Sequence, residues 1–498
     1  MNPINKRVRW AAIGACVLLL AVFVELNYIQ IFHASALDNN PRNTRDIIQQ
    51  YSEPRGAIIS ADGVTLAQSV PSDDQYKYQR VYPEGALFGQ ITGYDSLIYG
   101  TDGLEREYNS FLSESTTPTT LPGSLHQLEK FFTTQPAPDN LHITALASLQ
   151  EVAEQQLAGR DGAVVAISPK TGAVLAMYSN PGYNPTALAS HDGPVEEAAW
   201  KELNSNPGDP LAAASYRQRF FPGSTFKIIT AASVYDHKPA LATKNFPVSA
   251  GLVLPDTNGQ VLHNFAEEAC GGQMLELFTV SCDTGFAQLG LGVGGEALAE
   301  EARSFGWDQE TPLDMPGVAE SYFPPPSSFY QNAGALAKSA IGQESVQAVP
   351  LTLALDASAV ADKGIIMTPH LMQDITGSQG QVVEKYKPKE WIRATSQATA
   401  SKLGTLMTSV VNSPDGTGVA ARIPGVEVAG KTGTAQTGGP YIETWFVAFA
   451  PVQDPQIAVC VLVENQPPAD EYQGGTIAAP IAKAVIESYL GTRQGSSS

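Results

Sequence analysis

Residues 163–177 read AVVAISPKTGAVLAM. Two apolar runs, 163–167 and 173–177, flank the polar segment 168–172, whose Pro and Gly are typical of a turn. Short apolar runs bounded by turn residues are characteristic of buried strands. The stretch therefore predicts a β-hairpin in the interior of a folded domain.

The segments on either side of this hairpin predict the rest of the domain. Residues 146–157 carry apolar side chains at helical spacing, and residues 224–375 have a mainly helical pattern with Gly and Pro breaks. The chain then returns to strands and ends in a helix, and the expected ranges are 425–436, 444–450 and 457–464 for the strands and 477–489 for the helix. We expect an α+β domain over residues 141–490, in which helices cover one antiparallel sheet.

The part of the chain before residue 141 predicts a smaller module. A polar tether (36–53) leads to a strand-like segment at 55–59 with a turn at Ala61-Asp62-Gly63, and residues 113–140 have the Ser, Thr and Pro content of a linker. We expect this module to span residues 36–140. At the other end, residues 491–498 are polar and are expected to form a disordered tail.

A membrane anchor is expected at the N-terminus. Lys6, Arg7 and Arg9 precede an apolar stretch over residues 10–32, which at about 1.5 Å per residue can cross a bilayer as a helix. The basic residues predict that residues 1–9 are cytoplasmic and that the chain after the span is extracytoplasmic. The alternative is a cleaved signal peptide, because Ala34-Ser35-Ala36 has the small-x-small form of a cleavage site.

Composition narrows the class of protein. The 498 residues are too many for one ordinary core and predict two folded modules of unequal size. The formal net charge of −20 disfavours nucleic acid as a partner, because such a surface repels phosphate.

The positions of the cysteine and histidine residues indicate whether disulfides or metal sites are to be expected. Cys16 lies in the span, whereas Cys270 and Cys282 lie close together in a loop-like region and Cys460 lies in an apolar strand. In an oxidising compartment this predicts a Cys270–Cys282 disulfide and a buried Cys460 thiol. The sequence has no CxxC and no HExxH, so we expect no metal site. Residues 290–295 match GxGxxG but follow a helical segment, so we interpret them as a loop and expect no cofactor.

The first candidate for chemistry is Ser224-Thr225-Phe226-Lys227. On a helix, Ser224 and Lys227 lie on one face, so the lysine amine can accept the serine proton. Taken alone, the motif also fits a solvated helix start capped by Ser224.

The second candidate is Lys431-Thr432-Gly433-Thr434, at a strand edge. It offers a cation, two hydroxyls and an unobstructed backbone to an extended peptide. The same letters at Lys170-Thr171-Gly172 lie in the turn of the hairpin and are interpreted as a turn.

A third motif, Ser281-Cys282-Asp283, lies between these two, and the order of the three resembles the signature of penicillin-binding proteins and serine β-lactamases. The chain is most similar to class B, monofunctional penicillin-binding proteins of the actinobacterial penicillin-binding protein A kind. Flanking segments support this resemblance, namely Pro54-Arg55-Gly56, Asp62-Gly63, Gly103-Leu104-Glu105, Tyr108-Asn109, Ile341-Gly342-Gln343 and Thr444–Pro451.

The resemblance implies the activity of a D,D-transpeptidase. Ser224 would attack the D-Ala-D-Ala amide of a peptidoglycan stem peptide, and an amine of a neighbouring strand would resolve the acyl-enzyme. Lys227 would be the base, with a pKa lowered by burial and by a cation such as Lys431, and Ser281 would relay the proton to the leaving amine. The backbone N–H groups of Ser224 and Thr434 would form the oxyanion hole, and Lys431, Thr432 and Thr434 would hold the substrate carboxylate.

The resemblance also implies binding partners, and it leaves alternative functions open. β-Lactams should acylate Ser224, the early module resembles a dimerisation or pedestal domain, and glycan polymerisation would come from a membrane glycosyltransferase of the SEDS type. The rival functions are a D,D-carboxypeptidase or β-lactamase, in which water resolves the acyl-enzyme, and a β-lactam sensor or scaffold with little turnover.

The sequence departs from the family pattern at two positions. Asp283 stands where Asn is usual, and Ala145 stands where Asp is usual before the helix. Asp283 can point away from Lys227, be protonated through burial, or pair with a cation other than Lys227 and leave the base untouched. We expect it to lie on the cleft wall, with its charge offset by a neighbouring Lys or a backbone N–H.

Overall fold

A computed structural model describes residues 3–28, 51–113, 138–468 and 473–495. Helix α1 (Pro3–Tyr28) is apolar and exposed, and its segment Lys6–Glu25 is long and apolar enough to cross a membrane. It begins before the expected span of 10–32, and residues 29–32 and the possible cleavage site at 34–36 lie outside the described residues. Among the described residues, 3–28, 51–53 and 71–78 belong to one compact unit and the others to a second.

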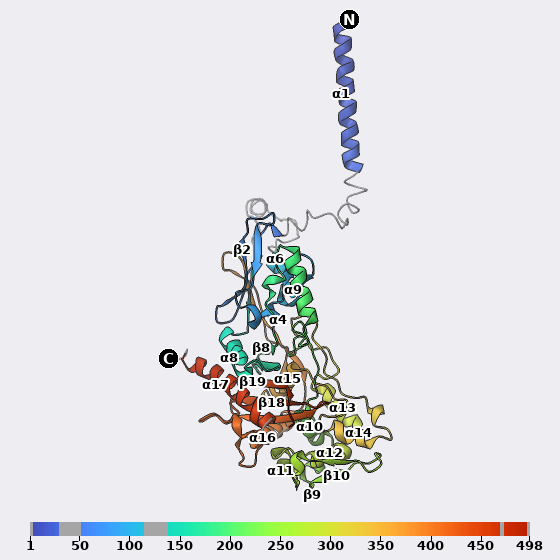
Figure 1. The fold of residues 1–498 in the computed structure, drawn as a ribbon, viewed down its shortest axis with the longest axis vertical. Helices are drawn as coiled ribbons and strands as arrows, with labels where there is room; N and C mark the ends of the chain where they lie inside the picture. Colours follow the sequence, from blue (N-terminus) through green and yellow to red (C-terminus); the bar gives the residue numbers. More distant parts are fainter. Residues whose placement is uncertain (1–2, 29–50, 114–137, 469–472, 496–498) are drawn as a thin grey trace. The chain divides into compact units, whose positions relative to one another are not determined.

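The central sheet has five antiparallel strands in the order β17-β18-β19-β7-β8 (Figure 1). Their bounds are β7 Gly162–Ile167, β8 Val174–Asn180, β17 Ala429–Gln436, β18 Ile442–Ala450 and β19 Ile457–Gln466. The predicted hairpin is confirmed as β7–β8. Its turn needs Gly172, which has φ +78°, and a Cβ there would lie 2.2 Å from the Thr368 carbonyl oxygen.

Helices cover this sheet on both sides (Figure 1). Helices α8 (Ala147–Leu157) and α17 (Ala479–Gly495) pack on one another and on the sheet, and the apolar α15 (Pro350–Ala361) packs on β7, β18 and β19. The α+β architecture predicted from the sequence is therefore confirmed. Helix α17 continues to Gly495, so residues 491–495, which we expected in a disordered tail, are helical.

The departure at Ala145 has a structural explanation. Asp62, in the turn between β1 and β2, accepts hydrogen bonds from the backbone N–H groups of Ala147 (2.9 Å) and Ser148 (3.0 Å) at the start of α8. Burial would raise the pKa of Asp62, but these bonds and one from Ser60 outweigh it and lower the pKa. A carboxylate distant in the sequence thus caps α8.

A second sheet has the order β15-β14-β6-β1-β2-β3. Its strands are β1 Ile58–Ile59, β2 Thr65–Pro71, β3 Tyr78–Val81, β6 Asn140–Ile143, β14 Met372–Thr376 and β15 Val382–Lys385. The expected module boundary at 140/141 falls inside β6, because β6 pairs with β1 on one side and β14 on the other.

The early segments that carried the family resemblance form a buried ionic cluster beside this sheet. The Glu105 carboxylate, on α5 (Gly103–Glu107), accepts from Arg55 Nε at 2.8 Å and Arg80 Nε at 2.6 Å, and all three side chains are buried. Burial would raise the pKa of Glu105, but the two guanidinium groups lower it. Shorter elements nearby are α4 (Gly89–Thr92), β4 (Asp95–Ser96), β5 (Gly100–Thr101), α6 (Asn109–Ser113) and α9 (Gly193–Ser205).

The middle of the chain is less helical than we expected. It contains helices α10 (Lys227–His237), α11 (Met274–Thr279), α12 (Asp283–Val293), α13 (Gly295–Ser304) and α14 (Ala333–Ser339). It also contains strands β9 (Phe246–Ser249), β10 (Gly251–Val253), β11 (Val261–His263), β12 (Cys270–Gly272) and β13 (Ile365–Met367). These strands have only three or four residues, too few to show a two-residue alternation in sequence. Strand β16 (Glu390–Arg393) and helix α16 (Gln397–Asn412) follow.

Candidate active site

Ser224 lies on a tightly packed turn at the mouth of a cleft. It belongs to the short 3-10 helix η4 (Gly223–Phe226), which leads directly into α10. Gly223 has φ +51° and donates its N–H to the Gly342 carbonyl oxygen at 3.0 Å, and a Cβ on Gly223 would lie 2.5 Å from the Thr434 carbonyl oxygen. The turn is thus fixed between β17 and the segment at Gly342.

The three predicted motifs meet around this cleft, which has a volume of about 1420 Å³. Side chains that line it include Ser224, Ser281, Asp283, Thr432 and Thr434. The two motif lysines, Lys227 and Lys431, are completely buried beneath it. Ser224 is partly buried, and the hydrogen bonds of the two lysine amines are to Ser281, Asp283 and Thr432 rather than to Ser224.

The Ser281 hydroxyl lies between the two lysines. Lys431 Nζ donates to Ser281 Oγ at 2.8 Å, and Lys227 Nζ lies 3.3 Å from the same oxygen and 2.7 Å from the Ser281 carbonyl oxygen. Ser281 has φ +58°, a left-handed conformation that is uncommon for a residue other than Gly. This conformation turns both the hydroxyl and the carbonyl oxygen toward the lysines.

The environment shifts the pKa of both lysines downward. Burial lowers the pKa of Lys227, although the Asp283 carboxylate acts in the opposite direction. Burial and the charge of Lys227 hold the pKa of Lys431 well below its ordinary value, again against the effect of Asp283. The charges of the two buried amines oppose one another, and the Asp283 carboxylate offsets part of that effect.

Asp283 lies on the cleft wall, as expected, but the group that offsets its charge is not the one expected. Its Oδ1 lies 2.7 Å from Lys227 Nζ, so it pairs with the proposed base itself and not with another cation. Asp283 is the first residue of α12 and follows the left-handed Ser281 by two positions, which places its carboxylate beside Lys227 at the start of α10. The expectation that the carboxylate would leave Lys227 untouched was therefore wrong.

The Lys431–Thr434 segment lies on β17, which is an edge strand of the central sheet. Gly433 is required there, since a Cβ would lie 2.8 Å from Thr225 Cγ2 and 2.9 Å from the Pro222 carbonyl oxygen. Thr432 Oγ1 is 2.6 Å from Thr417 Oγ1, a cleft residue that no sequence motif indicated. Lys170, of the similar turn segment, is exposed and pairs with Asp454 on the surface, away from this cleft.

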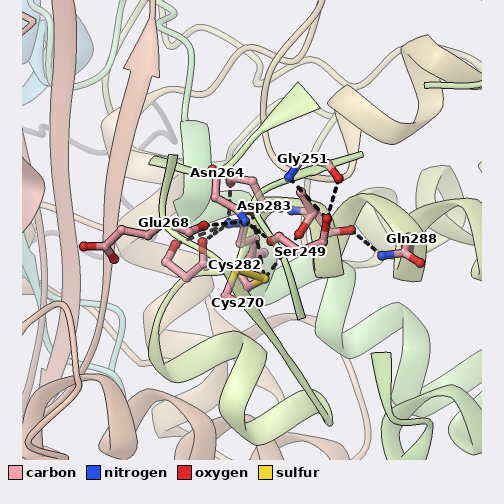
Figure 2. The surroundings of a disulfide bond; sticks show 11 residues. Ser249, Gly251, Asn264, Glu268, Cys270, Cys282, Asp283 and Gln288 are labelled. Carbon is pink, nitrogen blue, oxygen red and sulfur yellow. Dashed lines mark hydrogen bonds and ion pairs between the residues drawn. A yellow bond between two sulfur atoms is a disulfide. The ribbon is translucent and has the colours of Figure 1, made fainter. Parts of the chain in front are cut away.

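A disulfide joins Cys270 to Cys282, the pair expected from their spacing. It connects β12 to the residue between Ser281 and Asp283. Asn264 binds the same region: its side chain donates to the carbonyl oxygens of Ser249 and Glu268 at 2.8 Å each and accepts from the Thr284 N–H at 2.8 Å (Figure 2). Asn264 was missed because nothing in its sequence context distinguishes it from other loop asparagines.

The remaining sequence features lie outside the cleft. The expectation of a loop at residues 290–295 was wrong: residues 290–293 end α12, Gly295 begins α13, and Gly294 alone lies between them. A Cβ on Gly290 would lie 2.2 Å from Ala340 Cβ, so this glycine serves helix packing. Cys460 is a buried free thiol on β19. Within the described ranges, no three His, Cys, Asp or Glu side chains come together as metal ligands.

Comparison with known proteins gives matches to the whole chain. Residues 162–487 match the family model of the penicillin binding protein transpeptidase domain, and residues 55–134 match that of the penicillin binding protein A dimerisation domain. The chain is 36% identical to the peptidoglycan D,D-transpeptidase PbpA of Mycobacterium tuberculosis (strain H37Rv), with 98% of this chain and 99% of the relative covered. It is also 36% identical to PbpA of Mycolicibacterium smegmatis, with 99% and 100% covered. The structure of the ceftriaxone acyl-enzyme of M. tuberculosis penicillin-binding protein A superposes with a TM-score of 0.80 at 35% identity, covering 89% of this chain and 100% of that one.

Proposed function

Because this chain belongs to the penicillin-binding protein transpeptidase family, we propose that it is a peptidoglycan D,D-transpeptidase and that Ser224 is its nucleophile. The observation that supports these roles most directly is the position of the Ser281 hydroxyl, within hydrogen-bond distance of two buried lysines at the cleft that Ser224 lines. That arrangement provides a path for a proton between a base and a leaving group.

The reaction has two steps. In the first, Lys227 accepts the Ser224 proton, Ser224 Oγ bonds to the carbonyl carbon of the penultimate D-Ala, and the amide C–N bond breaks. Ser281 passes the proton to the departing D-Ala amine. In the second step an amine of a neighbouring stem peptide attacks the ester, forms the cross-link amide and releases Ser224.

Two groups of atoms bind the substrate in this scheme. The backbone N–H groups of Ser224 and Thr434 stabilise the oxyanion. Thr432 and Thr434, which line the cleft, hold the terminal carboxylate, the buried Lys431 balances its charge, and β17 offers its free edge to the extended peptide. Residues 141–490 form the catalytic domain in this proposal.

The anchor and the early module determine where the enzyme works. With Lys6, Arg7 and Arg9 at its start, α1 orients the N-terminus to the cytoplasm and the catalytic domain outside the membrane. The module at 36–140 matches a dimerisation domain over residues 55–134 and serves as a pedestal. A membrane glycosyltransferase of the SEDS type supplies the glycan strands.

Product analysis tests the function. Purified protein is incubated with a donor peptide ending in D-Ala-D-Ala and an amine acceptor, and the products are separated by mass. A transpeptidase forms the cross-linked peptide and releases D-Ala. Release of D-Ala without cross-linking would support a carboxypeptidase. Hydrolysis of bound penicillin would support a β-lactamase. A stable penicillin adduct without peptide turnover would support a sensor.

Replacing Asp283 with Asn should leave acylation unchanged or make it faster. The carboxylate raises the pKa of Lys227 against the effect of burial, so removing its charge lowers that pKa further. More Lys227 is then neutral at pH 7, and the rise of the acylation rate with pH shifts to lower pH. Acylation by a fluorescent penicillin, measured from pH 5 to 9, reports the shift.

Asp415→Asn is the matched control, since Asp415 lines the same cleft with an exposed side chain. This variant should change the net charge of the cleft without shifting the dependence of the acylation rate on pH. A 100-fold slower acylation in Asp283→Asn, about 2.7 kcal/mol of barrier, would mean that the carboxylate itself takes part in catalysis.

A further inference from the structure

Two buried phenylalanine residues flank the Ser281–Asp283 motif. Phe278 belongs to α11 and comes three residues before Ser281, and its carbonyl oxygen accepts from the Ser281 N–H at 3.2 Å. Phe286 belongs to α12 and comes three residues after Asp283. Both side chains are fully buried, and their ring centroids lie 5.9 Å apart in an edge-to-face arrangement. The two residues therefore form an aromatic pair that brackets the motif in sequence and meets in space.

Each motif lysine lies over one of these rings. Lys227 Nζ is 5.4 Å from the ring centroid of Phe286, and Lys431 Nζ is 5.7 Å from the ring centroid of Phe278. Both distances are within the roughly 6 Å over which the negative face of an aromatic ring attracts an ammonium group. The aromatic pair thus provides a separate ring for each amine.

The charges in the site require such compensation, because two buried amines share one carboxylate. A lysine side chain is almost never fully buried without a partner for its charge. Asp283 pairs with Lys227, whereas Lys431 donates to two neutral oxygen atoms and forms no ion pair within the described part of the chain. The ring of Phe278 therefore supplies negative electrostatic potential to an ammonium group that has no carboxylate partner.

We propose that Phe278 and Phe286 are positioning residues for the reaction: their ring faces hold the two motif lysines by cation–π attraction and keep one amine on each side of the Ser281 hydroxyl. Packing alone would require apolar side chains of this volume but no ring over which an amine lies. The inference rests on the proposed function, in which Lys227 accepts a proton and becomes an ammonium ion. The ring of Phe286 stabilises that ion, and the ring of Phe278 stabilises the charge of Lys431 that balances the substrate carboxylate.

Asp283 is the one carboxylate bonded to either amine in the described ranges. Charged groups on the neighbouring elements have other surroundings. Glu301 of α13 contacts His237 at the opposite end of α10 from Lys227, Lys402 of α16 lies over Tyr235, Lys338 of α14 pairs with Glu344, and Glu443 of β18 lies opposite Ala435, four residues along β17 from Lys431. A change in the pH dependence caused by the rings should therefore act through the two lysines and Asp283.

Removing the Phe286 ring should move the rise of the acylation rate to lower pH. The negative ring face favours the ammonium form of Lys227, so Phe286→Leu, which keeps an apolar side chain at this buried position, lowers the pKa of that amine. The strength of a cation–π contact corresponds to a shift of about 0.4 to 1.5 pH units. The test measures acylation of the full-length protein by a fluorescent penicillin from pH 5 to 9.

Removing the other ring should affect a different step. Phe278→Leu acts on Lys431, which balances the penicillin carboxylate, so initial binding of penicillin should weaken about 2- to 30-fold without the shift to lower pH. A merely structural role of the two residues would lower the unfolding temperature of both variants and would not divide their effects between binding and pH dependence.

Phe305→Leu is the matched control. Phe305 is equally buried, directly after α13, and within the described residues no Lys or Arg side chain lies over its ring. This variant should lower the unfolding temperature and leave both the pH dependence and the initial binding of penicillin at wild-type values.

Fluorinated phenylalanines in place of Phe286 separate the electrostatics of the ring from its shape. One, two and three fluorine atoms withdraw electron density from the ring face stepwise, so the shift to lower pH should grow along the series. This series also tests the inference if a Leu variant does not fold, because the ring itself is kept.

Three results would overturn the inference: a pH dependence that the fluorinated series leaves unchanged or moves to higher pH, an equal shift in Phe305→Leu, or wild-type penicillin binding by Phe278→Leu. The location of the wild-type penicillin adduct on Ser224 tests the proposed function separately, because the site of the adduct does not depend on either ring.

Discussion

Replacing Ser224 with Ala is expected to abolish covalent capture of penicillin. The intact wild-type protein should gain the mass of one penicillin, and peptide mapping should locate it on Ser224. The reason is that Ser224 lines the cleft on a fixed turn that leads directly into the buried Lys227, whereas the Ser281 hydroxyl is engaged by Lys431. Losing the oxygen removes the only atom in this scheme that can form the ester.

Ser413→Ala is the control for this experiment. Ser413 lines the same cleft directly after α16 and belongs to none of the three motifs, so its variant should retain the adduct. An adduct of undiminished yield in Ser224→Ala would place the nucleophile elsewhere and would contradict the assignment of the whole site.

The central sheet and the three motifs could be predicted because their signals are local. Apolar runs around a turn identify β7 and β8, and Lys431–Thr434 follows a strand pattern of its own. Each motif consists of only a few consecutive residues, and the order of the three motifs along the chain indicates the family. The short strands β9 to β12 gave no comparable signal because they depend on pairing with one another and on the Cys270–Cys282 bond.

Contacts between residues far apart in the sequence account for what could not be predicted. Asp283 meets Lys227, Asp62 caps α8 and Asn264 holds the start of α12, and each contact depends on tertiary structure. The same holds for the module boundary, where β6 pairs with strands from both sides of residue 140. The sequence near each of these residues does not show which distant residue it contacts. The charge environment of Lys227 could therefore be described only from the folded structure.

Replacing Lys227 with Met should lower the acylation rate by about 10² to 10⁴-fold, or roughly 2.7 to 5.4 kcal/mol of barrier. Met preserves much of the side-chain volume in a fully buried position, so the change removes the amine with little loss of packing. Without it, the scheme has no amine one helical turn from Ser224 to accept its proton, because Lys431 lies on a different element, β17. Stopped-flow measurement of penicillin acylation gives the rate.

The single variant also leaves the Asp283 carboxylate without its cation and beside an apolar side chain. This effect must be distinguished from the loss of the base. The double variant Lys227→Met/Asp283→Asn removes both members of the ion pair. If the stranded charge causes the loss, the double variant should recover most of the rate. If Lys227 is the base, the double variant should stay as slow as the single one, because neutralising Asp283 restores the local charge balance but supplies no group that can take the Ser224 proton.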